Sequence, residues 1–119
     1  MQFMLRFDGS EIDNQLRKIL EGAKALLKDT QKMFSIPAKT AGQAVLDMQQ
    51  PFIGTIVDEY ERRGGERAEV ACAEYWWMMA LACGMTGRLG EGQQYIRKAQ
   101  SRKGGVFHEW CQTFYKSSL

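Results

Sequence analysis

The sequence has little of several residue types whose abundance would identify a class of protein. Only two prolines and one histidine occur among its 119 residues, and no low-complexity run is present. A disordered or fibrous chain is therefore not expected. The three cysteines lack CxxC spacing, which favours free thiols in a reducing compartment over a disulfide framework.

Long apolar stretches are also missing. No segment is long enough to cross a membrane, and the apolar segment Met1–Phe7 is too short for the core of a signal peptide. The length suits one ordinary globular core and is too short for two. We therefore expect a single cytoplasmic domain over residues 1–119, with no membrane as a partner.

An excess of one charge is absent from the chain as a whole, because sixteen basic and fourteen acidic residues leave a net charge of +2. The two parts differ, however. Residues 1–87 carry ten basic and twelve acidic side chains, whereas residues 88–119 carry six and two. Cations near a helix C-terminus can simply complement the helix dipole, or they can form a patch for an acidic protein or a phosphate backbone. The candidate basic patch consists of Arg97, Lys98, Arg102 and Lys103.

Helical periodicity dominates residues 10–65. Apolar residues recur every three or four positions from Ile12 to Phe34, which indicates an amphipathic helix that begins near Ser10 and ends before Pro37. Ser10 with Asp13, and later Thr40 with Gln43, match capping-box spacing at two helix starts. Proline is tolerated in a first helical turn, so we expect a new helix at Pro51 that ends at Gly64-Gly65. Residues 1–9 are predicted to form an N-terminal arm or a short strand.

The second half of the chain is predicted to contain the central helix, at about residues 66–86. Its stretch Tyr75–Met85 has eleven residues without a charge, and a helix that is apolar all round must be covered on several sides. A turn at Gly87-Arg88 leads to another helix, and a final helix places Phe107, Trp110, Cys111 and Phe114 on one face. The predicted fold is all-α, a compact bundle of five to six helices.

Residues 73–100 resemble one tetratricopeptide repeat, a helix-turn-helix of about 34 residues. Large residues fall where the family packs them between turns, and small residues fall where its two helices approach closely. Trp110 lies thirty-four residues after Trp76, where a next repeat would place its tryptophan. The residues that carry the likeness are Trp76, Met79, Ala80, Gly87, Gly92, Ile96 and Ala99.

The resemblance implies that residues 66–119 form a helical hairpin followed by the final helix. One repeat cannot bury its own hydrophobic face, so the hairpin must pack on the N-terminal helices. The family typically binds a peptide or helix in its concave face. Two positions depart from the family pattern, because Cys83 replaces a tyrosine and Gly104 a proline. A generic helical hairpin is the alternative interpretation.

The cysteines and the histidine do not form a recognisable metal site. His108 and Cys111 lie one helical turn apart, and Cys72 and Cys83 would complete a set of four potential zinc ligands. Their spacing matches no ordinary zinc pattern, so buried structural cysteines are the preferred interpretation. No low-pKa environment for a catalytic thiol is evident either.

The carboxylates of residues 58–69 are interspersed with Arg62, Arg63 and Arg67, which is typical of a solvated, self-compensating helix end. The glycines at 84–92 follow no strand and precede no Gly-Lys-Ser/Thr, so they do not indicate a phosphate-binding loop. We therefore predict no enzyme, no metal and no cofactor.

The aromatic and methionine residues carry the remaining signal. Adjacent tryptophans on a helix point about 100° apart, so one can fill the core while the other lies nearer the rim. Core packing is the commoner fate of such a stripe. Two tryptophans and two methionines in a row are difficult to bury completely in a small domain, however, and an apolar groove for a partner helix is the functional alternative. The candidate partner-binding residues are Trp76, Trp77, Met78 and Tyr95.

The leading hypothesis is a non-catalytic interaction module, a small adaptor, inhibitor or chaperone that binds a helix or peptide segment of another protein. A nucleic-acid-binding protein that uses the basic patch is one alternative, with affinity that falls steeply with salt. A homo-oligomeric structural protein, such as a homodimer that buries its aromatic stripe against itself, is the other.

Overall fold

The structure, a computed structural model, describes residues 9–31, 38–49, 53–99, 102, 105–112 and 114–115. These residues form six α-helices and contain no β-strand, which confirms the predicted all-α bundle. The arm predicted over residues 1–9 lies outside the described residues except for Gly9, which begins the first helix. The helices are α2 (Gly9–Gln31), α3 (Ala38–Asp47), α4 (Ile53–Arg63), α5 (Gly65–Met85), α6 (Leu89–Ala99) and α7 (Gly105–Cys111).

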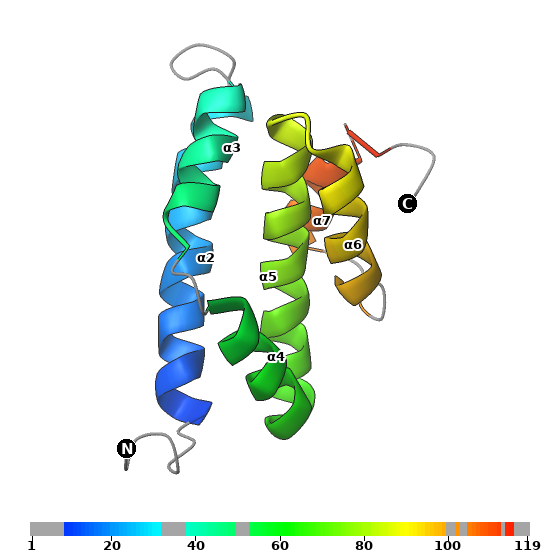
Figure 1. Ribbon diagram of the computed structural model, residues 1–119. Helices are drawn as coiled ribbons and strands as arrows, with labels where there is room; N and C mark the ends of the chain where they lie inside the picture. The colour runs from blue at the N-terminus through cyan, green and yellow to red at the C-terminus, as the bar shows by residue number, and fades with distance from the viewer. Residues whose placement is uncertain are drawn as a thin grey trace.

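Helix α5 is the centre of the molecule, as its uncharged stretch predicts. In Figure 1, α2 and α3 lie on one side of α5, α6 and α7 lie on the other, and α4 packs beside its N-terminal half. Every residue from Tyr75 to Met85 is buried. Because α5 supplies apolar side chains in all directions, the other five helices share one continuous core built around it. None of the helices that the structure describes is long and apolar enough to cross a membrane.

Helices α2 and α3 cover one side of α5. The stripe of α2 points inward as expected, with Leu16, Leu20 and Leu27 buried. The predicted start of α3 at Thr40 was two residues late, because the helix begins at Ala38. The side chain of Gln43 donates to Asp47 Oδ1 at 2.8 Å, further along the same helix.

Close approach between α3 and α5 depends on Gly42. A Cβ atom at this position would lie 2.8 Å from Cβ of Met85 and 3.0 Å from the carbonyl oxygen of Ala82. Both distances are too short for a comfortable contact, so only glycine allows the two helix backbones to pack this closely.

The breaks between helices lie close to the predicted positions. Helices α3 and α4 are separate, in agreement with a new helix at Pro51, although α4 begins at Ile53. Gly65, the first residue of α5, has φ 74°, and Gly87, between α5 and α6, has φ 80°. Glycine adopts this left-handed conformation without the steric penalty that other residues incur.

The end of the chain fastens α6 to α5. The hydroxyl of Tyr115 donates to the carbonyl oxygen of Ala80 at 2.7 Å. Its ring fits beside Gly92 so closely that a Cβ there would lie 1.8 Å from the Tyr115 hydroxyl oxygen. Helix α7 ends at Cys111, before Phe114, so the prediction of one helical face from Phe107 to Phe114 was too long. Phe114 nevertheless packs against the core.

Candidate functional site

A groove lies between α4 and α6, with α5 as its floor. Its volume is about 610 Å³, and all three helices contribute side chains to it. In Figure 1, α4 lies beside the N-terminal half of α5, and α6 runs along the other side of α5. We call this the α4–α6 groove. Its apolar lining consists of Ile53, Tyr75, Trp76, Met79 and Tyr95.

The aromatic residues of the groove hold one another in place. The rings of Trp76 and Tyr95 are stacked, with centroids 5.7 Å apart and an interplanar angle of 13°. Tyr75 meets Trp76 edge to face at 5.0 Å. The indole nitrogen of Trp76 donates to Glu61 Oε1 at 3.3 Å, and the Tyr75 hydroxyl donates to Gln49 Oε1 at 3.2 Å. Because each ring is fixed by a neighbour or a hydrogen bond, the lining is preorganised.

Charged side chains surround this lining. Lys98 of α6 reaches α4, where its Nζ lies 3.0 Å from Asp58 Oδ1 and 3.2 Å from Oδ2. The same Nζ lies 4.5 Å from the centroid of the Trp76 ring. Trp76 is only 2% exposed, with Tyr95 and Lys98 both against its ring. Glu91 is exposed on the groove and forms no salt bridge among the described residues.

Two of the four predicted partner-binding residues belong to the groove, and two do not. Trp76 and Tyr95 line it. Trp77 is 1% exposed and Met78 is fully buried. The indole nitrogen of Trp77 donates to the carbonyl oxygen of Arg102 at 2.9 Å, and its ring meets that of His108 edge to face at 4.7 Å. The expectation that this run is difficult to bury completely was wrong, because five surrounding helices provide enough cover.

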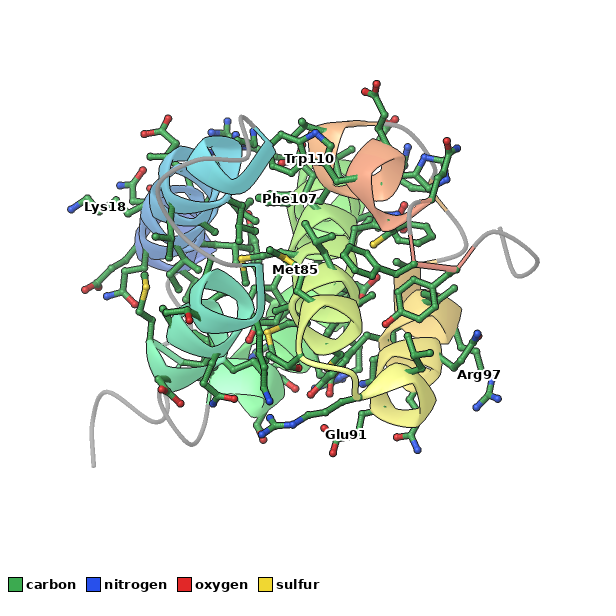
Figure 2. All side chains as sticks on the ribbon, turned by 90° about the horizontal axis from the view of Figure 1, so that it is seen from above. Lys18, Met85, Glu91, Arg97, Phe107 and Trp110 are labelled. Carbon is green, nitrogen blue, oxygen red and sulfur yellow. The ribbon has the colours of Figure 1, made fainter. Side chains whose placement is uncertain are left out.

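The predicted basic patch is not one surface of free cations. Lys98 is paired with Asp58 in the groove. Arg102 is paired with Glu69 at 3.0 Å and with Glu66 at 3.7 Å. Arg97 extends away from α6 into solvent, as Figure 2 shows. Lys103 lies outside the described residues.

The three cysteines are free and buried. The Cys72 thiol donates to the carbonyl oxygen of Val57 at 3.5 Å, and the Cys111 thiol to that of Trp77 at 3.4 Å. Burial raises the pKa of Cys72 and of Cys111 to about 12, and that of Cys83 to about 11. These thiols are protonated at neutral pH and are poor nucleophiles. Within the described part of the chain, no three histidine, cysteine or acidic residues are grouped so that they could hold a metal ion.

Helix α7 lies on the side of α5 away from the groove. Phe107 and Trp110 extend from it toward α2, as Figure 2 shows from above. Their rings meet edge to face at 6.0 Å, and Lys24 Nζ of α2 lies 5.8 Å from the Phe107 ring centroid. These contacts join α7 to α2 across the back of α5, and so support the groove's floor from behind.

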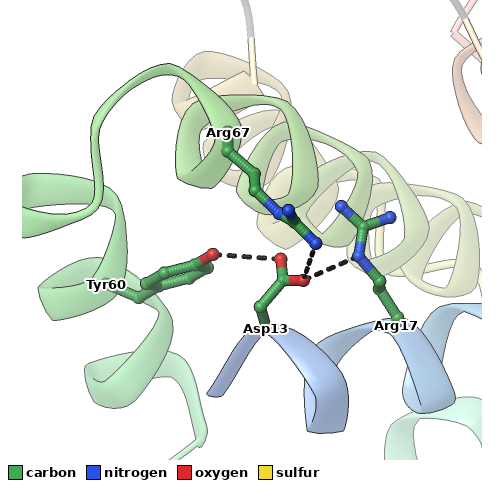
Figure 3. Close-up of polar contacts among 4 residues, drawn as sticks. All are labelled: Asp13, Arg17, Tyr60 and Arg67. Carbon is green, nitrogen blue, oxygen red and sulfur yellow. Dashed lines mark hydrogen bonds and ion pairs between the residues drawn. The ribbon is translucent and has the colours of Figure 1, made fainter. Parts of the chain in front are cut away.

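A buried aspartate that was not among the predicted site residues links three helices. Asp13 of α2 is 3% exposed. Its carboxylate accepts hydrogen bonds from Arg17 Nε at 2.8 Å, the Tyr60 hydroxyl at 3.0 Å and a terminal nitrogen of Arg67 at 3.0 Å (Figure 3). Burial alone would raise the pKa of Asp13, but the hydrogen bonds from these three residues together lower it below its ordinary value.

This cluster modifies the predicted charge pattern at the end of α4. Arg62 and Arg63 do pair with Glu59 of the same helix, as a self-compensating helix end predicts. Arg67 instead reaches Asp13 of α2. A signal was present in the sequence, because Asp13 falls three residues before Leu16 and seven before Leu20, on the inward face of α2.

Comparison with known proteins gives no relative from which a function could be transferred. The chain matches no family model, and neither the curated proteins nor the solved structures include a match to it.

Proposed function

We propose that this chain is a non-catalytic interaction module that binds a helix or peptide segment of a partner protein in the α4–α6 groove. The observation that carries the proposal is the groove itself, a hollow of about 610 Å³ with an aromatic floor and a charged rim. Binding sites on proteins combine an apolar, preorganised centre with a polar edge in this way. Tryptophan, tyrosine and methionine are also the residues that protein interfaces favour.

Kinship with the tetratricopeptide family is part of the proposal. Its support is the α5–α6 hairpin, in which Ala80 and Gly92 are buried where the two helices meet. Trp76 and Tyr95, one from each helix of the hairpin, stack at the groove. The partner then lies between the hairpin and α4 and needs no further repeat.

The proposal includes the cytoplasm as the location and the absence of catalysis. Three free, buried thiols suit a reducing compartment. Burial raises the pKa of all three thiols, which makes them poor nucleophiles and supports a non-catalytic role.

The two alternatives have less support. Nucleic-acid binding needs cations that are available to phosphate groups, and both Lys98 and Arg102 are paired with carboxylates. A homo-oligomer that buries the aromatic stripe against itself needs that stripe at the surface, whereas residues 75–85 are buried within one chain.

The test fills the groove without disturbing the fold. Gly54 lines the groove, and a Cβ at this position would have no atom within 4 Å. Gly54→Phe therefore places a ring in the groove from the α4 side. Gly90 of α6 is the matched control, because it is exposed, has equally free space and does not line the groove.

Proteins from a lysate of the native cell are captured on the immobilised wild-type chain and on both variants, with and without nuclease. The expected result is a partner protein that the wild type and Gly90→Phe retain, that Gly54→Phe loses, and that survives nuclease. Circular dichroism and thermal melting confirm that both variants fold. Retention of all partners by Gly54→Phe, or their loss on nuclease treatment, would contradict the proposal.

A further inference from the structure

The α4–α6 groove differs in charge from the rest of the chain. The chain carries a net charge of +2, whereas the groove's lining holds the carboxylates of Asp58 and Glu91 against the single ammonium group of Lys98. Glu61 lies just behind, as the acceptor for Trp76. The groove is therefore a locally acidic site on a slightly basic protein, and charge complementarity favours a cationic occupant.

Lys98 shows what such a cation contacts. Its ammonium group lies 4.5 Å from the centroid of the Trp76 ring and within 3.2 Å of both carboxylate oxygens of Asp58. The face of an aromatic ring and a carboxylate both attract a cation, and together they define a cation-binding position. Lys98 is 44% exposed and Asp58 is 53% exposed at their side chains, so the pair is held at the surface. Exposed ion pairs of this kind contribute little to stability, so another cation can replace Lys98 at low cost.

We propose that the groove receives a basic segment of a partner protein. A lysine or arginine of that segment takes the position over Trp76 and beside Asp58 that Lys98 occupies in the free chain. This inference rests on the proposed function and specifies the chemistry of the partner.

The rest of the groove defines the neighbours of that basic residue. Met79 and Ile53 line the groove beside Trp76, so apolar side chains next to the cation have an apolar surface to cover. Glu91, on α6 and without a salt bridge among the described residues, is available for a second basic residue. The expected occupant is a segment in which one or two lysines or arginines alternate with apolar or aromatic residues.

The test uses a library of random peptides displayed on phage and selected on the full chain. Peptides that also bind Gly54→Phe are removed, so the remaining peptides need the groove. Lysine or arginine should be enriched at one position beside apolar residues. Replacement of that residue by methionine in the best peptide should weaken binding by about tenfold, measured by fluorescence anisotropy.

Two charge variants locate the contact. Asp58→Asn should weaken binding of the basic peptide about as much as replacement of the peptide's basic residue by methionine does. Asp47→Asn is the control, because Asp47 is exposed on α3 and lies outside the groove, and it should leave binding unchanged. Lys98→Met keeps an apolar stem and removes the competing charge. It should therefore tighten binding of the basic peptide by about two- to tenfold. Unchanged or weaker binding to Lys98→Met would show that Lys98 does not occupy the partner's position.

The outcomes separate this inference from the proposed function. The selected peptides could depend on the groove and yet have no basic position, or methionine could replace their basic residue without weakening binding. Either result would overturn the proposal of a basic segment, while the groove would remain a docking site. If no selected peptide distinguishes the wild type from Gly54→Phe, both proposals fail. If the chain binds oligonucleotides and Asp58→Asn strengthens that binding, then Lys98 binds phosphate groups. That result would also overturn the inference.

Discussion

The contact between Gly92 and Tyr115 gives the sharpest test of how the α5–α6 hairpin is held. Gly92→Ala normally improves a helix by up to about 1 kcal/mol. Here the added Cβ would lie 1.8 Å from the Tyr115 hydroxyl oxygen and 2.8 Å from ring atom Cζ. The two groups cannot occupy these positions together, so Tyr115 must leave its site.

The expected loss follows from what Tyr115 contributes in place. Tyr115 is 3% exposed, and its hydroxyl donates to the Ala80 carbonyl oxygen. Removal of a buried aromatic ring costs about 3–5 kcal/mol. After the gain in helix propensity is subtracted, Gly92→Ala should lower the free energy of unfolding by about 2–4 kcal/mol.

The decisive measurement is a double-mutant cycle by urea unfolding. In a Tyr115→Ala background the obstructing ring is absent, and the next-nearest atom, the Ala80 carbonyl oxygen, lies 3.3 Å from the new Cβ. Gly92→Ala should then be close to neutral or stabilising, so the two substitutions should couple by at least about 2 kcal/mol. Additive effects would refute the reasoning, because they would mean that Tyr115 does not occupy the space beside Gly92 in solution.

Three further predictions concern titration and backbone conformation. The lowered pKa of Asp13 means that its stabilising effect is present above the unfolded pKa of about 3.9 and is lost as the pH falls through the folded pKa. Between about pH 6 and about pH 3, the wild type should therefore lose more unfolding free energy than the Asp13→Asn variant, as measured by urea unfolding. The pKa of each buried thiol is raised above 9.0, so the stability that the thiols contribute is present below that pH and is lost as the pH rises toward their folded values. The native protein should resist alkylation by iodoacetamide at about pH 8, and rapid labelling without denaturant would contradict the burial. Gly65→Ala should lower stability by about 1–2 kcal/mol because φ of Gly65 is 74°. Gly54→Ala should instead raise stability by up to about 1 kcal/mol. If thermal melting shows that both substitutions shift the melting temperature in the same direction, this explanation is wrong.

The sequence predicts the helices well because their signals are local. The uncharged stretch 75–85 identifies the central helix, and the glycines at 65 and 87 identify the turns that bound it. The start of α3 was misplaced by two residues because capping-box spacing also occurs inside a helix. The end of α7 was misplaced because an apolar spacing continues beyond Cys111 as a turn that still packs on the core.

The groove was predicted only in part, since its members come from three helices. The adjacent pair Trp76 and Trp77 illustrates the difficulty. Helical geometry places them on different sides of α5, but the sequence does not say which side the other helices leave for a groove. The structure places Trp76 beside α4 and α6, and Trp77 beneath Arg102 and His108.

Long-range polar contacts could not be read from the sequence for a related reason. Asp13 and Arg67 are separated by 54 residues, and Lys98 and Asp58 by 40. Asp13, Arg67 and Asp58 each have opposite charges within four residues in the sequence, so local pairing was the simpler prediction for them. Lys98 has no acidic residue that close, and its neighbours Arg97, Arg102 and Lys103 suggested a basic patch instead. Only the fold decides which of the competing partners lies within reach.

The complete enclosure of α5 also determines how this protein can diverge over evolution. A helix with a solvent face accumulates substitutions there at little cost. Over residues 75–85 every side chain is packed, so replacements must nearly conserve volume and remain uncharged. The outward faces of α2 and α6 meet water and are free to change. In proteins that share an ancestor with this chain, the middle of α5 would be the last stretch of sequence to lose its likeness.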